Sequence, residues 1–507
     1  MQKRATVAKK QLLTRLESSY MSQARLTVGL LWLATTTALA EPVYQPPGAN
    51  LTYGDVTHGQ RIQSASGNPA AAAADLARGT EKRTRGTVLS FAAGLEYGNI
   101  QELWDFFDDL TKAYEPSDPG TGGGPGQLPE DKPDGGIDLG DIWDSLDPDF
   151  QATIAAVAQE VATQTVLLAL VRNEGYGKAW VAADAPFVLG SEHFGGALTF
   201  GAKWSGTSKA FGLVQEIDFD EDTARQALED WFNQLPIDRP VQLPIGGDIL
   251  LSIDPFTDAV LFAIQNDSSM LSKASQTTEL EVGYSRQAWS NPSGSLFLGA
   301  EARLYFMRLS RVSVRFGDIT DSEELFDAIR DSDFDDDTRV GFDIGALWVG
   351  KNYQLGAQLT NVNQPKFTFP DLDLSLYSDD AIIGLIQGDT IYTMDRQLKL
   401  EASLFTSDRR WSAHLGVDVD PATDPMGDEY QWLTFSAGYA GDSWWLPGAR
   451  IGYRQNLAGT EMEYVSVGLT AFKILNIDIS SALDSVTIDG QSLPRGLMLA
   501  IGFQISW

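Results

Sequence analysis

The chain has no cysteine and only three histidines among its 507 residues. The absence of cysteine excludes thiol catalysis, disulfide bonds and thiolate metal sites, and three scattered histidines leave little for a multi-histidine metal centre. Basic residues are also scarce, because 37 Lys and Arg stand against 69 Asp and Glu, a formal net charge of −32. Nucleic acid is therefore not an expected partner, since its recognition needs clustered Lys and Arg.

Residues 1–40 are predicted to be a leader with a signal peptide, and Met21 is an alternative start of the chain. Arg25 is followed by an apolar run over 26–39 that ends in the small-residue cleavage motif Ala-Leu-Ala. The run is shorter than the roughly 20 residues of a membrane-spanning helix, which favours export over an anchor. Removal of the leader takes away six basic residues and one acidic residue, so the mature charge is −37.

Segments in which large apolar residues alternate with small or polar ones recur about a dozen times after the leader. A period of two with one apolar face is the pattern of a β-strand. No run of about 18 apolar residues follows the leader, so no helical membrane span is predicted. The last alternating segment places these large apolar residues on one face: Leu497, Leu499, Ile501, Phe503, Ile505 and Trp507.

Two features favour a membrane barrel over a secreted β-sandwich or propeller, whose strands also alternate. Glycine and charged residues occur mid-strand on the non-apolar face, as a water-filled lumen allows. Aromatic residues lie near the predicted strand ends, where they suit the lipid–water boundary: Trp348, Trp411, Trp432, Trp444, Trp445 and Trp507. Because only closure removes sheet edges in lipid, we predict an all-β, transmembrane antiparallel barrel in the outer membrane of a Gram-negative bacterium.

The connections between strands alternate between long and short when counted back from a periplasmic C-terminus. With 195–216 and 294–316 taken as single tall strands, the count is about fourteen, and single-chain outer-membrane barrels have even numbers. Phe503, Ile505 and Trp507 form the predicted C-terminal signal for the barrel-assembly machinery. The long connections are predicted to be extracellular, partly helical insertions at 99–176, 218–276, 317–337 and 363–395.

Four short motifs carry a family resemblance: Asn68-Pro69-Ala70, the acidic run Ser332 to Asp337, Leu355 to Val362 ahead of Pro365, and Ala449 to Ala458. Through them the chain resembles the FadL-like outer-membrane barrels, most closely the TraF-like branch named after plasmid-transfer operons. The resemblance implies a fourteen-stranded barrel over 84–507 and a small N-terminal hatch over 41–83. In FadL-like relatives the hatch gates the passage of hydrophobic molecules, and Asn68, Pro69 and Ala70 are the hatch residues that match.

Charged and polar residues on the inward face of the predicted strands are the main candidate site. They either pair across the lumen and hold the hatch in place, or contact a solute. The predicted lumen-facing polar residues are Glu301, Arg303, Arg339, Asp343, Lys399, Glu401, His414, Asp418 and Asp478.

No catalytic residue and no cofactor are predicted. Ser412, His414 and Asp418 share one face of a predicted strand and superficially resemble a hydrolase set. Alternate residues on a strand lie about 7 Å apart, too far for a nucleophile–base hydrogen bond without help from another strand. A solvated lumen histidine is the simpler interpretation.

Asp333, Asp335 and Asp337 are weak candidates for a calcium site. Their run lacks the Gly and the distal Glu of an EF-hand loop, so a solvated acidic loop is the simpler interpretation. The same applies to the acidic residues between 420 and 429. No metal site is therefore firmly predicted.

The preferred hypothesis is an outer-membrane transport barrel whose hatch occludes the lumen and opens for small hydrophobic solutes. The alternative is a structural or assembly protein of the cell surface, associated with conjugation or the envelope, that docks partners through 99–176 and 218–276. An enzyme is disfavoured, because the sequence offers no convincing nucleophile–base pair. The expected partners are outer-membrane lipid, the barrel-assembly machinery and small hydrophobic ligands.

Overall fold

The structure is a computed structural model. It describes residues 47–58, 67–78, 83–98, 175–191, 195–215, 241–244, 249–254, 259–264, 266–315, 318, 332–388, 390–441, 444–488 and 491–506. The predicted leader, the hatch residues 59–66 and nearly all of the insertion at 99–176 lie outside these ranges.

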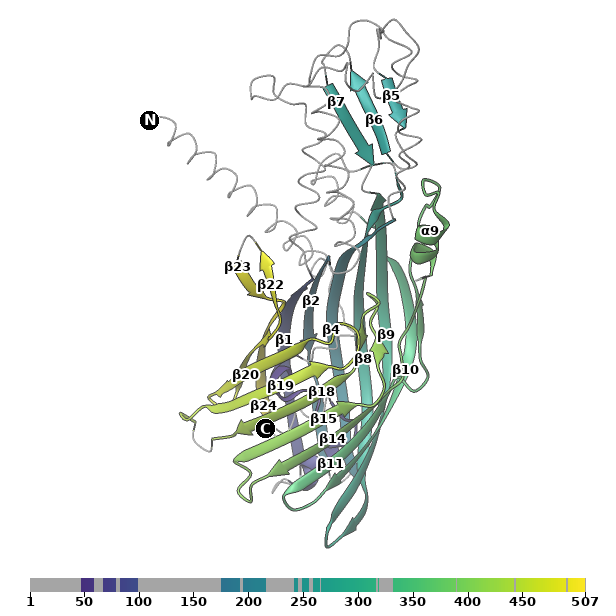
Figure 1. The fold of residues 1–507 in the computed structure, drawn as a ribbon. Coiled ribbons are helices and arrows are strands. Elements are labelled where there is room, and N and C mark those ends of the chain that lie inside the picture. The colour runs from purple at the N-terminus through teal and green to yellow at the C-terminus, as the bar shows by residue number, and fades with distance from the viewer. Residues whose placement is uncertain are drawn as a thin grey trace, which may run out of the picture.

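Fourteen antiparallel strands of the described chain close into one barrel, as predicted (Figure 1). β1 (Arg83–Tyr97) pairs on one side with β24 (Gly496–Ser506) and on the other with β2 (Tyr176–Asp184) and β3 (Phe187–Ser191). Because β2 and β3 both pair with β4 (Gly196–Leu213), they are two halves of one barrel strand. The other strands of the wall are β8 (Ser269–Asn291), β9 (Gly294–Arg315), β10 (Asp335–Val349), β11 (Tyr353–Thr360), β14 (Gln397–Phe405), β15 (Trp411–Asp418), β18 (Trp432–Tyr439), β19 (Gly448–Asn456), β20 (Glu463–Ala471) and β21 (Leu475–Ala482).

The outer face of the wall is apolar. Ile451, Val467, Ile479 and Leu499 are neighbours in register across four adjacent strands, and each is 47–56% exposed. A row of exposed aliphatic side chains is costly in water and favourable against lipid tails. The alternation seen in the sequence therefore separates this face from the interior. Within the described residues, no helix has the length and apolar character needed to cross a bilayer.

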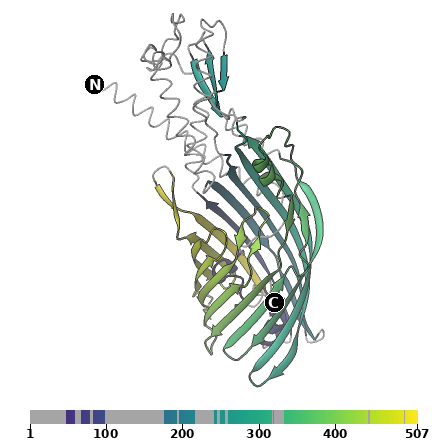
Figure 2. The ribbon, with the colours of Figure 1, turned by 45° about the vertical axis from the view of Figure 1, so that its right-hand side comes forward.

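Short elements stand beyond the upper ends of the strands, on the side away from the C-terminus (Figures 1 and 2). α9 (Asp380–Gln387) is capped by Asp379, whose side chain accepts hydrogen bonds from two backbone amides of the first turn. Five short strands also stand there: β5 (Val241–Pro244), β6 (Ile249–Asp254), β7 (Ala259–Ile264), β22 (Ser485–Ile488) and β23 (Gln491–Pro494). β12 (Lys366–Thr368) pairs with β13 (Ile391–Thr393) and lies against β9 and β10, and β16 (Ala422–Thr423) pairs with β17 (Glu429–Tyr430) in the connection between β15 and β18.

Two predicted insertions are shorter than expected, because barrel strands extend into them. β8 already begins at Ser269, inside the insertion predicted over 218–276, and pairs there with β4 and β9. β10 begins at Asp335, inside the insertion predicted over 317–337, and pairs with β9 from that residue onward. The polar composition of these strand sections concealed them in the sequence, since little of either section shows an apolar face.

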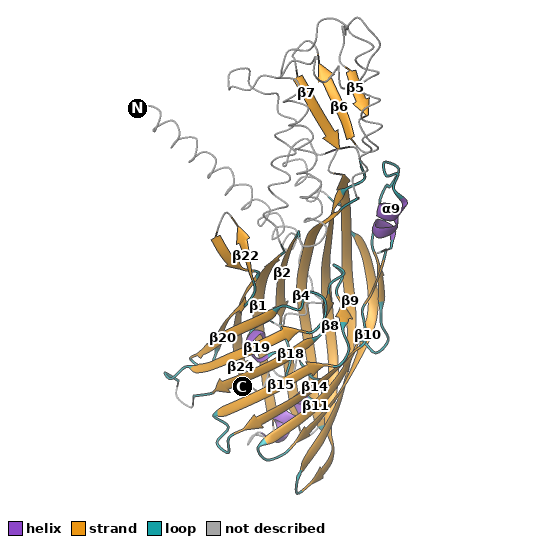
Figure 3. Cartoon of the chain, in the orientation of Figure 1, coloured by secondary structure: helices purple, strands orange, loops and turns teal. Residues whose placement is uncertain are grey.

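The inner segment (residues 47–58 and 67–78) lies inside the barrel and carries two short helices, drawn in purple within the ring of strands in Figure 3. α2 (Asn50–Tyr53) contacts β18, β19, β20 and β21, whereas α3 (Ala71–Arg78) contacts strands from β1 to β10 on the other side. α2 ends at Gly54, whose φ of +75° favours glycine.

Glycines on the inner face of the wall provide room for the inner segment. A Cβ at Gly299 would lie 2.2 Å from the carbonyl oxygen of Pro69, and one at Gly345 would lie 2.3 Å from Oδ1 of Asn68. A Cβ at Gly416 would lie 2.7 Å from the side chain of Val56. The sequence interpretation of inward glycines as a wet lumen is wrong at these positions, because they are contact points for protein.

Most of the aromatic residues predicted to lie at the lipid–water boundary are found at the short turns between strands, at the end of the barrel nearer the C-terminus. Trp348 lies 5.6 Å from Trp289 between ring centroids, and Trp411 lies 4.9 Å from Tyr439. The prediction that Trp432 lies at the lipid–water boundary is wrong, because its side chain points into the barrel and stacks on Tyr430. Its strand places the odd-numbered residues outward, so the even number of Trp432 puts it on the lumen face.

Candidate functional site

Polar contacts connect the inner segment to the wall of the barrel. Lys399 Nζ lies 2.8 Å from a carboxylate oxygen of Asp55. Thr57 donates from both its hydroxyl (2.6 Å) and its backbone amide to the carboxylate of Glu401. Asn68 donates to the same carboxylate over 3.2 Å. Two predicted lumen residues, Lys399 and Glu401, thus contact the segment directly.

On the opposite side, α2 is tied to a buried ion pair. The hydroxyl of Thr52 donates to Asp478 over 2.5 Å, and Asp478 pairs with Arg450 at 2.5 Å. Both side chains of the pair are almost inaccessible, at 0% and 1% exposure. Removal of one member would leave an uncompensated buried charge, which costs about 3–5 kcal/mol.

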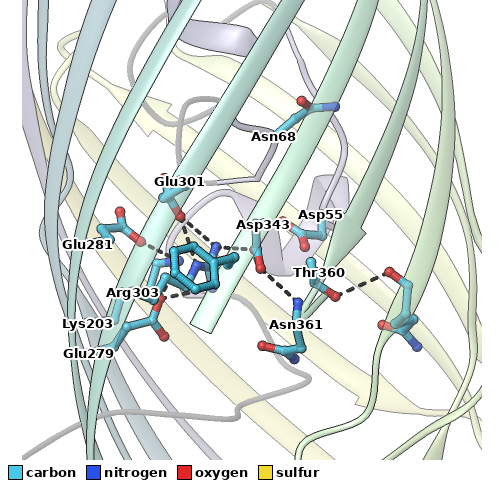
Figure 4. Close-up of polar contacts among 12 residues, drawn as sticks. Asp55, Asn68, Lys203, Glu279, Glu281, Glu301, Arg303, Asp343, Thr360 and Asn361 are labelled. Carbon is cyan, nitrogen blue, oxygen red and sulfur yellow. Dashed lines mark hydrogen bonds and ion pairs between the residues drawn. The ribbon is translucent and has the colours of Figure 1, made fainter. Parts of the chain in front are cut away.

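A second charged group lines the wall on β4, β8, β9 and β10 and is shown in Figure 4. Arg303 is its centre: it lies 2.9 Å from Glu279, 2.8 Å from Glu301 and 2.9 Å from Asp343. Lys203 lies 3.0 Å from Glu281. All of these side chains are buried, and Asp343 also accepts a hydrogen bond from the backbone amide of Asn361.

The connection between β15 and β18, residues 419–431, reaches the opposite wall and is called the strap below. Its Asp424 and Asp428 both pair with Lys178 of β2, the latter at 2.7 Å, and Asp428 also pairs with Lys209 of β4. β15 lies seven strands from β2 in either direction around the ring. The strap therefore crosses the mouth of the barrel.

The ion pairs of the strap shift the pKa of Asp428. Burial raises the pKa of Asp428, but the ammonium groups of Lys178 and Lys209 outweigh burial and hold the pKa below its usual range. Tyr430 reinforces the contact, because Lys178 also donates to its hydroxyl over 2.6 Å.

A cavity of about 140 Å³ lies between the inner segment and the strap. Asp55, Val56 and Asn68 line it from the inner segment, and Ala422 lines it from the strap. Met394 lines it from the connection before β14, and the wall contributes both charged and apolar groups: Lys203, Glu279, Arg303, Tyr305, Lys399, Glu401, Asp418, Trp432 and Arg454.

Residues 65–420, well over half of the chain, match the family described as "F plasmid transfer operon, TraF, protein". The chain belongs to this family. The match runs from the Asn68-Pro69-Ala70 segment to the start of the strap, and therefore includes both the inner segment's contacts with β9 and β10 and the charged group around Arg303.

Solved structures similar to this TraF-family chain are barrels. A deletion mutant of the TodX monoaromatic hydrocarbon channel is 11% identical, with 91% of this chain and 98% of that chain covered and a TM-score of 0.39. A FadL homologue of Pseudomonas aeruginosa is 10% identical (93% and 99% covered, TM-score 0.25), and a Rh. blastica porin variant is 10% identical (83% and 100% covered, TM-score 0.22). Similarities of this size place no ligand or activity on this chain. No curated protein matches it.

The TraF-family barrel has the architecture of an outer-membrane protein. A closed antiparallel ring leaves no backbone group unpaired within lipid, and its apolar outer face matches the hydrocarbon core. Phe503 and Ile505 of the predicted assembly signal are exposed on this face, and Trp507 lies outside the described residues.

Ser412, His414 and Asp418, which superficially resemble a hydrolase set, contact different partners. His414 Nδ1 instead lies 2.8 Å from the hydroxyl of Ser403 on the neighbouring strand, and that hydroxyl donates to the carbonyl of Thr57. Asp418 accepts a hydrogen bond from the backbone amide of Trp432. The histidine is therefore part of the contact between the wall and the inner segment.

Arg339 is the predicted lumen residue that the structure places elsewhere. It belongs to the section of β10 that pairs with β9 alone, since the pairing with β11 starts only at Ile344. Its side chain is 43% exposed and pairs with Asp337 at 2.7 Å. The residue follows the inward alternation of its strand but lies beyond the buried interior.

The predicted calcium candidates are not a converging group in the described structure. Asp335 and Asp337 lie on β10, and Asp337 is paired with Arg339, while Asp333 precedes the strand and is exposed. The acidic residues Asp424 and Asp428 of the strap are paired with lysines rather than arranged around an ion.

Sequence reasoning missed Glu279 and Glu281, although a signal for them was available. The two glutamates are separated by Leu280 and followed by Val282, both exposed on the outer face, so the alternation places the carboxylates inward. Lys178 was missed for a different reason. Its partner Asp424 lies 246 residues away, and no local pattern indicates that contact.

Proposed function

We propose that this TraF-family barrel is an outer-membrane channel whose lumen is closed at rest and opens for small solutes when the inner segment moves. The observation that carries the proposal is how the segment is held. Ion pairs and hydrogen bonds from Asp55, Thr57 and Asn68 reach single residues of the wall. Water can replace these polar contacts at low cost. Release of α3 must also separate Ala70 and Ala72 from the buried apolar side chains of the wall, so this part of the segment is held more firmly than the part around Asp55 and Thr57.

The solute class follows from the cavity. Trp432, Tyr305 and Met394 offer apolar surface, while Lys399 and Asp418 offer charge in the same space. We expect a small solute with an apolar body and a polar group, which is narrower than the hydrophobic solute predicted from the sequence. We expect no hydrolytic activity, because the Ser403–His414 contact lies beneath the inner segment and is joined to its backbone.

A disulfide lock tests the proposal. A Cβ at Gly416 would lie 2.7 Å from Cγ1 of Val56, so Val56→Cys with Gly416→Cys brings two sulfur atoms within bonding reach. The chain has no other cysteine, so the pair cannot exchange with a native thiol. In liposomes, the oxidised variant should admit no solute and the reduced variant should behave like wild type.

Two controls accompany the lock. Each single cysteine variant should be insensitive to oxidant, and deletion of residues 41–83 should raise permeability above that of wild type. Solute entry at the wild-type rate through a barrel whose disulfide is confirmed on a gel would show that the inner segment is not the gate.

A second candidate is a structural or assembly role at the cell surface. The family description names a plasmid-transfer operon, and the three strands β5 to β7 form a separate small sheet beyond the barrel. This role requires a stable partner in detergent extracts that is lost when 216–268 is replaced by a short linker. It also requires that neither the lock nor the deletion alters permeability.

A further inference from the structure

Three carboxylates converge on the inner wall of the barrel beside the cavity. Glu279 and Glu281 project from β8 and Glu301 projects from β9, and the carboxylate oxygens that each could offer a metal lie within 4.8 Å of one another. All three residues are buried, with exposures of 0%, 6% and 5%. Figure 4 shows them around Arg303 and Lys203.

The charges of this cluster do not balance. Asp343 joins the three glutamates as a fourth carboxylate, whereas Lys203 and Arg303 are the two cations that pair with them. Four acidic and two basic groups leave a formal charge of −2 in a buried place. Burial of an uncompensated charge is strongly unfavourable, so the cluster must bind a further cation or take up protons.

The ion pairs engage one carboxylate oxygen of each glutamate, and not every remaining oxygen has a partner. Arg303 pairs with Oε1 of Glu279 and Oε1 of Glu301, and Lys203 pairs with Oε2 of Glu281. Glu279 is the clearest case, because it is fully buried and its Oε2 has no hydrogen-bond partner among the described residues. An unsatisfied carboxylate oxygen in a buried site is a vacant ligand position.

The cluster is open to the cavity and adjacent to the inner segment. Glu279, Lys203 and Arg303 line the cavity, so an ion has a space from which to enter. Along β9 the residue two positions before Glu301 is Gly299, whose Cα packs against Pro69. The carboxylates therefore lie next to the point at which the inner segment contacts the wall.

We propose that Glu279, Glu281 and Glu301 bind a divalent cation, and that the cation is Ca²⁺. The converging carboxylate donors are hard oxygen ligands, which suit Ca²⁺ or Mg²⁺ rather than zinc or copper. The ligands come from two strands with fixed spacing, and Ca²⁺ accepts irregular arrangements of six to eight oxygens that Mg²⁺ does not. A charge of +2 neutralises the cluster. The proposed Ca²⁺ site does not depend on whether solutes pass through the lumen.

The test measures Ca²⁺ binding to the full chain in detergent after removal of metal with a chelator. Titration calorimetry with CaCl₂ should show one Ca²⁺ more per chain for wild type than for Glu279→Gln or Glu301→Gln. The matched control replaces Asp333, Asp335 and Asp337 by Asn, which removes exposed carboxylates and should keep the site. Heat-modifiable migration on a gel verifies that each variant is folded.

A variant that does not fold is replaced by Glu281→Asp, which keeps the charge but shortens the side chain and should lose the ion. Equal binding by wild type and by the folded cluster variants would overturn the proposal. So would loss of binding in the control alone, which would place the ion in the exposed loops. A wild-type chain that binds no Ca²⁺ but becomes more stable as the pH falls would show that protons neutralise the cluster.

Discussion

Replacement of Gly299 by alanine should loosen the inner segment without altering the barrel. The added Cβ would lie 2.2 Å from the carbonyl oxygen of Pro69 and 2.6 Å from the backbone nitrogen of Ala70. Ordinary contacts begin near 3.4 Å, and both neighbours are backbone atoms that cannot rotate away. The segment must therefore shift by about 1 Å, and overpacking of this kind costs about 1–3 kcal/mol.

The overpacking weakens the contact between the inner segment and the wall. The fraction of molecules in which the segment is undocked should therefore rise roughly 5- to 150-fold. Hydrogen exchange reports this fraction through the backbone amide of Ala73, which donates to the hydroxyl of Ser285 in the docked state. Small-solute entry into liposomes should rise in parallel if the segment is the gate.

Gly384→Ala is the matched control, because a Cβ at that position of α9 meets nothing within 4 Å. It should leave exchange at Ala73 and solute entry unchanged. If Gly299→Ala exchanges no faster than this control, the reasoning from the close approach to Pro69 is refuted.

Three further predictions concern the wall and the strap. Val467→Arg places a charge in the lipid-facing row and should cost about 2–4 kcal/mol, measured as a lower folded fraction in bilayers, whereas Val467→Leu should be neutral. Arg450→Met leaves Asp478 buried without its partner and should destabilise the fold by about 3–5 kcal/mol in denaturant titrations; a loss below 1 kcal/mol would contradict the buried pair. The depressed pKa of Asp428 means that its contribution to strap docking is complete above the unfolded pKa near 4 and declines as the pH falls toward the folded value. Proteolysis of the strap should accelerate below about pH 4 in wild type, and Lys178→Met should show high cleavage at every pH.

The fold could be predicted because lipid imposes a simple rule on every strand. Leu499 and Val467 reveal their exposed face through alternation alone, and chain closure follows from the need to pair every backbone group. The rule concerns only the outer face. It does not say what occupies the interior, so it could not show that Gly299 and Gly345 lie against Pro69 and Asn68.

The candidate site was only partly predictable for a related reason. Lys399, Glu401 and Asp478 could be placed inward from their strands, but their partners depend on how a separate segment folds within the ring. The strap was beyond prediction, because it starts at β15 and its Asp424 meets Lys178 on β2, on the opposite side of the ring. The alternation of a strand shows which face of the sheet a side chain lies on. Its partner across the barrel depends on how the complete ring is built.

The strap has a consequence for biogenesis. Its contacts join β15 to strands half a circumference away, so they require that the sheet between them has curved into the ring. Contacts between such distant parts of a chain are late events in folding. Protection of Lys178 and Asp428 is thus expected only once the curved sheet has formed, and chains that have not reached that stage would present these charges to water.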